Sequence, residues 1–178
     1  RRRKGVPVTR IGGKWENWGR SVRVRPVRIE RPSSVEAVQR AVVSAARSNL
    51  RVKAVGAGHS FTGIAVAPDV LLDLSDLHGV LDVDRERMRV RLFAGTRLHQ
   101  IPGLLRPYGL AMQNLGDIDR QSITGATSTG THGTGATFGG ISTQIVGATF
   151  VDAEGELHSV GDTLTAPRVS RHVSRAPA

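Results

Sequence analysis

The chain has 178 residues, a formal net charge of +10 and no cysteine. Its length supports one domain with a hydrophobic core and is too short for two ordinary domains. The lack of cysteine excludes disulfide frameworks, cysteine-based zinc sites and thiol nucleophiles.

The basic charge is concentrated at the two ends of the sequence. Residues 1–31 hold eleven Lys or Arg against two acidic residues, residues 161–178 hold three against one, and residues 32–160 hold eleven against twelve. Because the central part is close to neutral, nucleic-acid binding by the domain itself loses its main support, although the Arg-rich N-terminus could contact a polyanion. We therefore expect no nucleic-acid partner.

No apolar run in the sequence approaches the roughly 18 residues of a membrane span. The basic residues 1–4 are not followed by the apolar core of a signal peptide. We expect a cytoplasmic protein without a membrane span.

Residues 1–20 lack helical and strand periodicity, which predicts an irregular basic lead-in. The two tryptophans in it, Trp15 and Trp18, either pin this arm onto the domain or stack on bases, and pinning is the commoner role. Residues 21–29 alternate apolar residues with arginines and contain Pro26, which is typical of an extended edge segment.

The next segment predicts a helix. Ser33 and Glu36 have the spacing of a capping box, with Ser33 as the N-cap. Spacings of three and four predict the apolar face, and Asn49 is a plausible helix end. The predicted face consists of Val35, Val38, Val42, Ala45 and Ala46.

The remaining pattern predicts several short strands, at residues 52–55, 70–74, 80–83, 88–93, 145–151 and 156–160. Within residues 95–106, Pro102 and Gly103 make any helix short or kinked. The order of these elements predicts an α+β domain over residues 21–160 without a regular βαβ alternation. Residues 161–178 have no periodic apolar pattern and are expected to be disordered.

Glycine and hydroxyl residues are dense from Asn114 to Gly135, and from Ser122 onward this stretch carries no formal charge. Glycine lets a backbone approach a ligand closely, and Ser and Thr add small hydrogen-bond donors. Such a segment suits a phosphorylated cofactor. The same composition also makes turns between strands, and composition alone does not decide between the two.

A second glycine-rich loop, Gly56–Ser60, follows a predicted strand. It is not a Rossmann fingerprint because Phe61 stands where the third glycine is required. A phosphate-binding nest of backbone amides remains. His59 in this loop could be a nucleophile, a general base or a hydrogen-bonded structural histidine. The six histidines show no metal-ligand spacing, so no metal site is expected.

Two segments together resemble a known family. V-K-A-V-G-A-G-H-S-F-T at residues 52–62, followed by L-G-D-I-D-R-Q-S-I-T-G-A-T-S-T-G-T-H-G-T-G at residues 115–135, is similar to the flavin-binding half of the vanillyl-alcohol oxidase superfamily. Within that superfamily the sugar-lactone and alditol oxidases are the nearest match, and the similarity spans about residues 15–160. It implies a PCMH-type FAD-binding domain of two small α+β subdomains with FAD between them.

The resemblance implies an assignment of the site. His59 matches the position at which oxidases of this branch carry the flavin through a histidyl bond to its 8α-methyl carbon. FAD would take up hydride from a sugar lactone or polyol, and O₂ or another acceptor would reoxidise it; no catalytic residue is implied. The implied FAD contacts are Gly56, Ala57, Gly58, His59 and Ser60 in the first segment, and Asp117, Ser122, Gly125, Thr129, Gly130, Thr131, His132 and Gly133 in the second.

The similarity ends near Val160. Related enzymes continue into a C-terminal substrate domain, whereas residues 168–178 resemble nothing in the family. We therefore expect a truncated, frame-shifted or deliberately shortened chain in which that domain is missing. Two other hypotheses stay open, a cofactor-binding module without turnover and a basic nucleic-acid binder.

Overall fold

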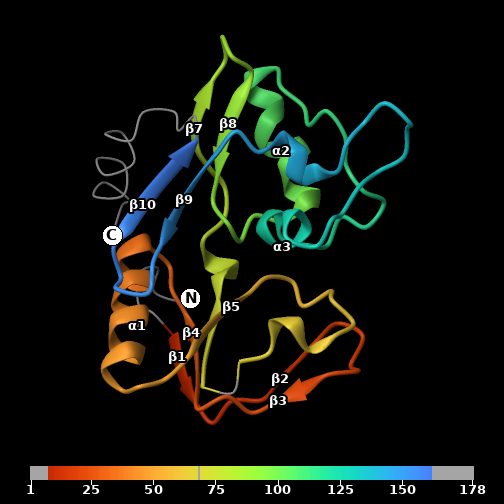
Figure 1. Ribbon diagram of the computed structural model, residues 1–178. Coiled ribbons are helices and arrows are strands. Elements are labelled where there is room, and N and C mark those ends of the chain that lie inside the picture. Colours follow the sequence, from red (N-terminus) through yellow and green to blue (C-terminus); the bar gives the residue numbers. More distant parts are fainter. Residues whose placement is uncertain (1–7, 68, 162–178) are drawn as a thin grey trace.

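The computed structural model describes residues 8–67 and 69–161 (Figure 1). It contains three α-helices, α1 (Val35–Arg47), α2 (Ile101–Leu105) and α3 (Ile123–Thr127). The strands are β1 (Val8–Ile11), β2 (Trp15–Glu16), β3 (Arg23–Val24), β4 (Arg28–Arg31), β5 (Val52–Val55), β6 (Val70–Asp73), β7 (Val80–Asp84), β8 (Arg89–Leu92), β9 (Gly147–Val151) and β10 (Leu157–Gly161). The predicted α+β class is confirmed. Nearly all of the segment expected to be disordered, and residues 1–7 of the lead-in, lie outside the described residues.

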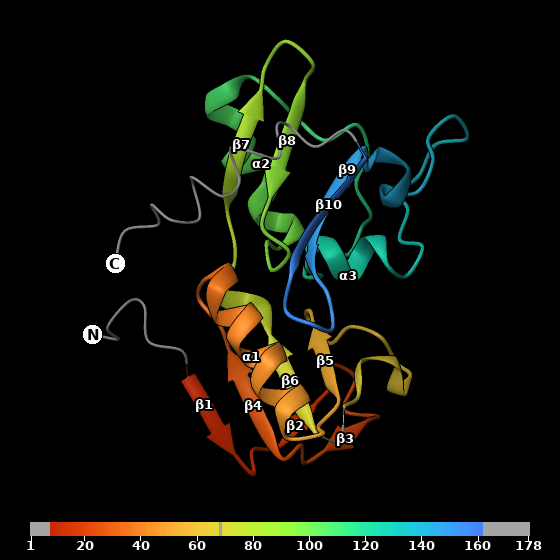
Figure 2. The same ribbon diagram turned by 60° about the vertical axis from the view of Figure 1, so that its left-hand side comes forward.

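The N-terminal half is a four-stranded sheet in the order β1-β4-β6-β5, with α1 packed on one face (Figure 2). β1 is antiparallel to β4, while β4, β6 and β5 run parallel. Ala41 and Ala45 of α1 form a core with Val70 and Leu72 of β6. Small alanines allow the helix to approach the sheet closely.

The start of α1 differs from the prediction by one residue. Ser34, not Ser33, is the N-cap: its Oγ accepts a hydrogen bond from the amide of Ala37 at 3.2 Å. The helix ends as predicted, because Asn49 adopts a positive φ of 52° and the amide of Leu50 returns to the carbonyl of Ala45 at 2.9 Å.

The buried face of α1 is also rotated from the predicted one. Its fully buried members are Ala37, Ala41 and Ala45, whereas Val38 and Val42 are half-buried at its border. Ala46, which we expected on this face, is exposed. The valines dominated the predicted pattern, but the smaller alanines lie nearest the sheet.

The N-terminal segment is more ordered than predicted. β1 and β2 lie within the expected irregular stretch 1–20, and β1 is an edge strand of the main sheet. The extended edge segment predicted at residues 21–29 is confirmed in part: β3 is an edge strand of the two-stranded β2–β3 sheet, whereas residues 28–29 belong to β4, which pairs with β1 on one side and β6 on the other. Because Pro26 lies before β4 and not within it, every residue of β4 keeps a backbone amide for strand pairing. The domain boundary at residue 20 stays a prediction.

The C-terminal half contains the hairpins β7–β8 and β9–β10 together with α2 and α3. Its separate core is built from residues of α2, α3 and the adjoining turns, namely Leu98, Ile101, Leu105, Ala126 and Ile141. α2 is short and has a proline in its first turn, as its sequence predicted. Two cores in one chain agree with two small α+β subdomains.

The turn between β9 and β10 lies against α1 and joins the halves (Figures 1 and 2). Gln39 Nε2 donates a hydrogen bond of 2.7 Å to the carbonyl oxygen of Gly155. A Cβ atom on Gly155 would lie 2.5 Å from Val43 Cγ2, so a side chain there would push the turn off the helix.

Candidate functional site

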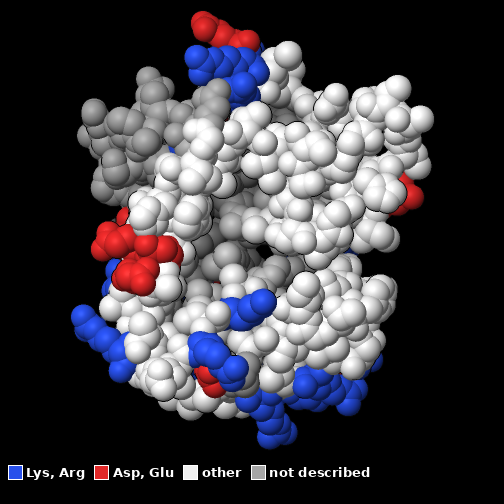
Figure 3. Space-filling model, viewed as in Figure 1, with Lys and Arg blue, Asp and Glu red and all other residues white. Residues whose placement is uncertain are grey.

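A cavity of about 310 Å³ lies between the two halves of the chain. Its walls come from five segments, which are β5 with the following loop, Ile64 and Ala65, Leu74 and Ser75, residues 94–97, and residues 121–129. Figure 3 shows the surface hollowed between the halves. The volume is within the range of small-molecule and cofactor sites, roughly 300–1,000 Å³.

The loop Gly56–Ser60 forms one wall because it continues directly from the buried end of β5 at Val55. Gly58 turns the chain with φ of 70°, a conformation that favours glycine. His59 and Ser60, which follow this turn, are half-buried. The turn thus brings the imidazole to the cavity rather than into the core.

The start of α3 forms the opposite wall. Ser122 is buried and caps the helix, with its Oγ accepting from the amide of Gly125 at 3.2 Å. The amide of Ile123 donates to the carbonyl of Thr96 at 2.8 Å, and Arg97 forms an isolated β-bridge with Ser122. These contacts fix the second motif beside residues 94–97.

Glycines let the walls come together. A Cβ atom on Gly56 would lie 2.2 Å from Ser122 Oγ, and one on Gly95 would lie 1.9 Å from the carbonyl oxygen of Leu74. Neither position accepts a side chain without movement of the opposing wall. The two sequence motifs therefore meet across the cavity.

The lining is positively charged. Lys53 and Arg97 line the cavity, and none of its described lining residues is Asp or Glu. Arg97 is held in place by its Nη1, which donates to the carbonyl of Arg120 at 3.1 Å. Backbone amides, hydroxyls and two cations suit a phosphorylated anionic group, so the residues present fit a dinucleotide cofactor.

The electrostatics of His59 follow from its surroundings. Burial and the positive charge of Arg97 both lower the pKa of His59 below its ordinary value. At neutral pH the imidazole is therefore neutral, and one ring nitrogen keeps a free lone pair.

The structure brings together eight of the predicted site residues. Those that line the cavity are Gly56, Ala57, Gly58, His59, Ser60, Ser122, Gly125 and Thr129. The other five do not line it: Asp117, Gly130, Thr131, His132 and Gly133.

The five residues outside the cavity have other surroundings. Thr131 Oγ1 exchanges hydrogen bonds with the side chain of Gln121. A Cβ atom on Gly133 would lie 2.1 Å from the carbonyl oxygen of Leu115, so this glycine serves close backbone packing. Asp117, Gly130 and His132 are exposed. Their assignment as FAD contacts stays a proposal.

Several lining residues were not predicted from the sequence, among them Lys53, Ser75, Arg97, Gln121 and Ser128. Gly95 and Thr96, shortly after β8 ends at Leu92, were the one local signal for the wall that holds Arg97. The other residues lie in elements whose positions depend on how the two halves pack.

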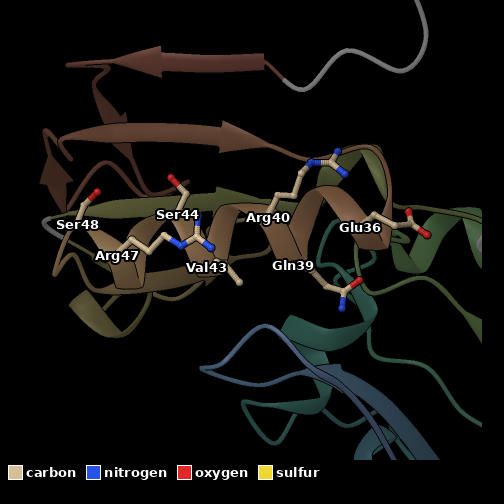
Figure 4. A pocket seen from close by; sticks show the side chains of 7 residues that line it. All are labelled: Glu36, Gln39, Arg40, Val43, Ser44, Arg47 and Ser48. Carbon is tan, nitrogen blue, oxygen red and sulfur yellow. The ribbon is translucent and has the colours of Figure 1, made fainter.

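A larger hollow of about 650 Å³ lies along α1 (Figure 4). Its lining residues all belong to that helix or its C-terminal cap, from Glu36 to Ser48. A hollow lined by a single helix offers contacts on one side only, whereas the smaller cavity surrounds a ligand with several segments. We therefore place the site at the smaller cavity.

Two further features of the described residues bear on other types of site. None of the described helices is long and apolar enough to cross a membrane. No group of three or more His, Asp or Glu side chains gathers in residues 8–67 and 69–161 as a metal site would require. The expected cytoplasmic location stays a prediction.

Comparison with known proteins identifies related sequences. A family model described as "FAD binding domain" matches residues 26–161. L-gulono-1,4-lactone dehydrogenase of Mycobacterium tuberculosis is 42% identical over 158 residues, which cover 88% of this chain and 37% of that protein. L-gulonolactone oxidase of Bos taurus is 36% identical, covering 82% and 33%, and D-arabinono-1,4-lactone oxidase of Candida glabrata is 37% identical, covering 80% and 28%. The chain thus spans about a third of the length of these relatives.

Solved structures show the same fold at lower identity. Cholesterol oxidase from B. sterolicum superposes with a TM-score of 0.74 at 21% identity, covering 87% of this chain and 32% of that one. A variant of BBE-like 1 from Physcomitrella patens gives a TM-score of 0.76 at 22% identity, covering 89% and 36%.

Proposed function

The chain belongs to the FAD binding domain family, and on that premise we propose that it supplies the FAD-binding part of an oxidoreductase that oxidises a sugar lactone or polyol. The observation that carries the proposal is the cavity in which the loop Gly56–Ser60 faces the start of α3, with no Asp or Glu among the lining residues in the described part of the chain. The lactone is suggested by the names of the sequence relatives. Substrate, electron acceptor and turnover are proposed for the whole protein.

The chain's own residues would divide the work of binding FAD. The backbone amides of Gly56–Ser60 would form a nest for the diphosphate. The amides of Ile123 and Gly125 at the start of α3 are already bonded within the protein and would not contribute. Lys53 and Arg97 would balance its negative charge from the same cavity. Once bound, FAD supplies a two-electron acceptor for the hydride of a C–H bond that bears a hydroxyl group.

His59 would bear the flavin covalently. A neutral imidazole has the lone pair that bond formation needs, and the lowered pKa of His59 keeps that form present at neutral pH. His59 would hold the 8α-methyl carbon through one ring nitrogen and would give up its N–H proton. Forming this bond is a two-electron oxidation overall, for which an acceptor such as O₂ would take up the electrons.

A second candidate is a cofactor-binding module without turnover. It rests on the same cavity, whose lining residues suit an anionic cofactor. The two candidates share FAD binding and differ only in whether a substrate is oxidised.

Reconstitution of the purified chain with FAD tests both candidates. Absorbance after gel filtration should show bound flavin, and acid precipitation should leave the yellow colour with the protein. Oxidation of L-gulono-1,4-lactone with an artificial acceptor would favour the enzyme, and bound FAD without oxidation would favour the module. A colourless protein that takes up no FAD would refute both.

A further inference from the structure

The imidazole of His59 is covered on one face by the indole ring of Trp18, which does not line the cavity. The rings of Trp18 and His59 are stacked, with centroids 5.2 Å apart and an interplanar angle of 23°. Trp18 is 65% exposed, so its ring is not placed there by burial in a core. Its indole shields one face of the imidazole from water.

The backbone on both sides of His59 is held by the same short segment. The amide of Trp18 donates to the carbonyl of Gly58 at 2.8 Å, and Asn17 Nδ2 donates to the carbonyl of Ser60 at 2.9 Å. The two carbonyls that flank His59 are therefore both bound by residues 17 and 18.

Asn17 is itself fixed. It is 2% exposed, its Oδ1 accepts from the amide of Val22 at 3.0 Å, and its Nδ2 also donates to Ser21 Oγ at 2.9 Å. A buried amide with its donors and acceptor satisfied is costly to move, because any shift leaves a polar group unpaired. The hairpin β2–β3 thus presents residues 17 and 18 in one arrangement.

We propose that Asn17 and Trp18 form a clamp that positions His59 for attachment of FAD. The role of the clamp in FAD attachment rests on the proposed function, but its contacts are present in the chain without FAD. Bond formation requires one imidazole nitrogen to point at the cavity, and a free loop would let the ring sample several rotamers. Because small misplacements of a reacting group cost large factors in rate, a held imidazole reacts faster than a loose one.

Two substitutions of Trp18 separate the effect of a flat ring from that of apolar volume. Trp18→Phe keeps a flat ring over His59, whereas Trp18→Leu keeps only apolar volume. Phe61→Leu is the matched control, because Phe61 meets Trp18 edge-on at 6.2 Å and does not line the cavity. Asn17→Asp keeps the acceptor for Val22 and removes both donated hydrogen bonds.

Two measurements read the clamp. The first is the NMR chemical shift of the His59 ring protons in the FAD-free chain. The stacked indole moves this shift away from the value of a free imidazole, and Trp18→Leu should return it toward that value. The second is the rate of acid-stable flavin incorporation, which should fall by roughly tenfold or more in Trp18→Leu and Asn17→Asp. Trp18→Phe should lose less, Phe61→Leu should match the wild type, and releasable FAD should bind nearly equally to all.

The outcomes distinguish the clamp from the proposed function. If the wild-type chain holds only releasable FAD, the histidyl bond is refuted. The clamp is then tested by the spectra of the FAD-free chain alone, and an unchanged chemical shift of the His59 ring protons in Trp18→Leu overturns it. If the wild type incorporates flavin and Trp18→Leu does so at the same rate, the clamp is wrong and the proposed function stands. Equal loss in Trp18→Leu and Trp18→Phe would also overturn a role for stacking.

Discussion

Gly56 and Ser122 meet across the cavity so closely that a Cβ atom on the glycine would lie 2.2 Å from Ser122 Oγ. Ser122 cannot move away cheaply, because it is buried and its Oγ caps α3. The contact therefore ties the first motif to the second, and it is specific enough to test.

We predict that Gly56→Ala destabilises the fold by roughly 1–3 kcal/mol, as expected for overpacking, and weakens FAD binding. Gly103→Ala in α2 is the control, because a Cβ atom there meets nothing within 4 Å. That variant should be as stable as the wild type or about 0.5–1 kcal/mol more stable, since alanine favours helix over glycine. Denaturant unfolding and FAD titration measure both effects. Equal stability of the two variants would contradict the close contact.

Gly133 should matter for folding before it matters for FAD. A Cβ atom there would lie 2.1 Å from the carbonyl oxygen of Leu115 and 2.5 Å from Asn114 Oδ1. We predict that Gly133→Ala lowers the melting temperature of the FAD-free chain. Thr134→Ala, at the exposed neighbouring residue, is the control. A substitution of Gly130 would be unsuitable, because its positive φ would strain any side chain. A normal FAD-free melt combined with lost FAD affinity would make Gly133 a direct contact.

Replacing Arg97 by Gln should raise the pKa of His59 toward its ordinary value. Burial also lowers this pKa, so the recovery should be incomplete. An NMR titration of the His59 ring protons measures the change. Arg106→Gln, an exposed arginine outside the cavity lining, should leave the titration unchanged. If Arg97→Gln does not raise this pKa, the charge of Arg97 is not felt at the imidazole.

The same shift affects stability in a definite direction. Because the folded pKa of His59 is lowered, the unfolded chain binds the proton first as the pH falls through about 6.5. Acidification from neutral pH down to the folded pKa should therefore destabilise the fold. This loss should be smaller in Arg97→Gln, and a larger loss would contradict the sign of the effect.

Asp152 should make the fold sensitive to acid. Burial alone would raise its pKa, but hydrogen bonds from the Glu156 amide, the His158 side chain and the Glu154 amide outweigh it and lower the pKa. Such a carboxylate stabilises the fold above its unfolded pKa, about 3.9, and the contribution is lost as the pH falls toward the lowered value. Asp152→Asn should flatten the fall of melting temperature in that window. Asp76→Asn, at an exposed carboxylate, is the comparison.

The N-cap of α1 offers a matched pair of adjacent serines. Ser34→Ala removes the hydrogen bond to the amide of Ala37 and should cost about 1 kcal/mol of folding free energy. Ser33→Ala, one residue earlier, should cost little. Denaturant unfolding of the two variants measures the difference. A larger loss of folding free energy for Ser33→Ala would show that Ser33, as predicted from the sequence, is the N-cap.

Local chemistry made part of this site predictable. The loop Gly56–Ser60 could be identified because a glycine turn is encoded by neighbouring residues, whereas Ser122 was identified only through the family resemblance and its role as a helix cap was not predicted. The predicted positions that fail to line the cavity, such as His132 and Gly130, followed from one long motif whose second half turns away from it. A sequence motif does not show where along its length the chain leaves the ligand.

The rest depended on tertiary packing. Asn17 and Trp18 reach His59 only after β2 and β3 have paired, and Arg97 reaches it only after the two halves have met. The interior position of β4 in the sheet likewise depends on its pairing with β1. β1 is a short strand followed by glycines, and its sequence resembled that of a loop. Contacts between segments distant in sequence leave no periodic signal in either segment.

The hydrogen bond between Gln39 and Gly155 ties α1 to the β9–β10 turn, and the FAD cavity draws its walls from both halves. A ligand that contacts both halves stabilises their association by its own binding free energy, which grows with the logarithm of its concentration. The melting temperature of this protein is therefore set jointly by its sequence and by its flavin occupancy. Two preparations with the same sequence but different FAD saturation should unfold at different temperatures.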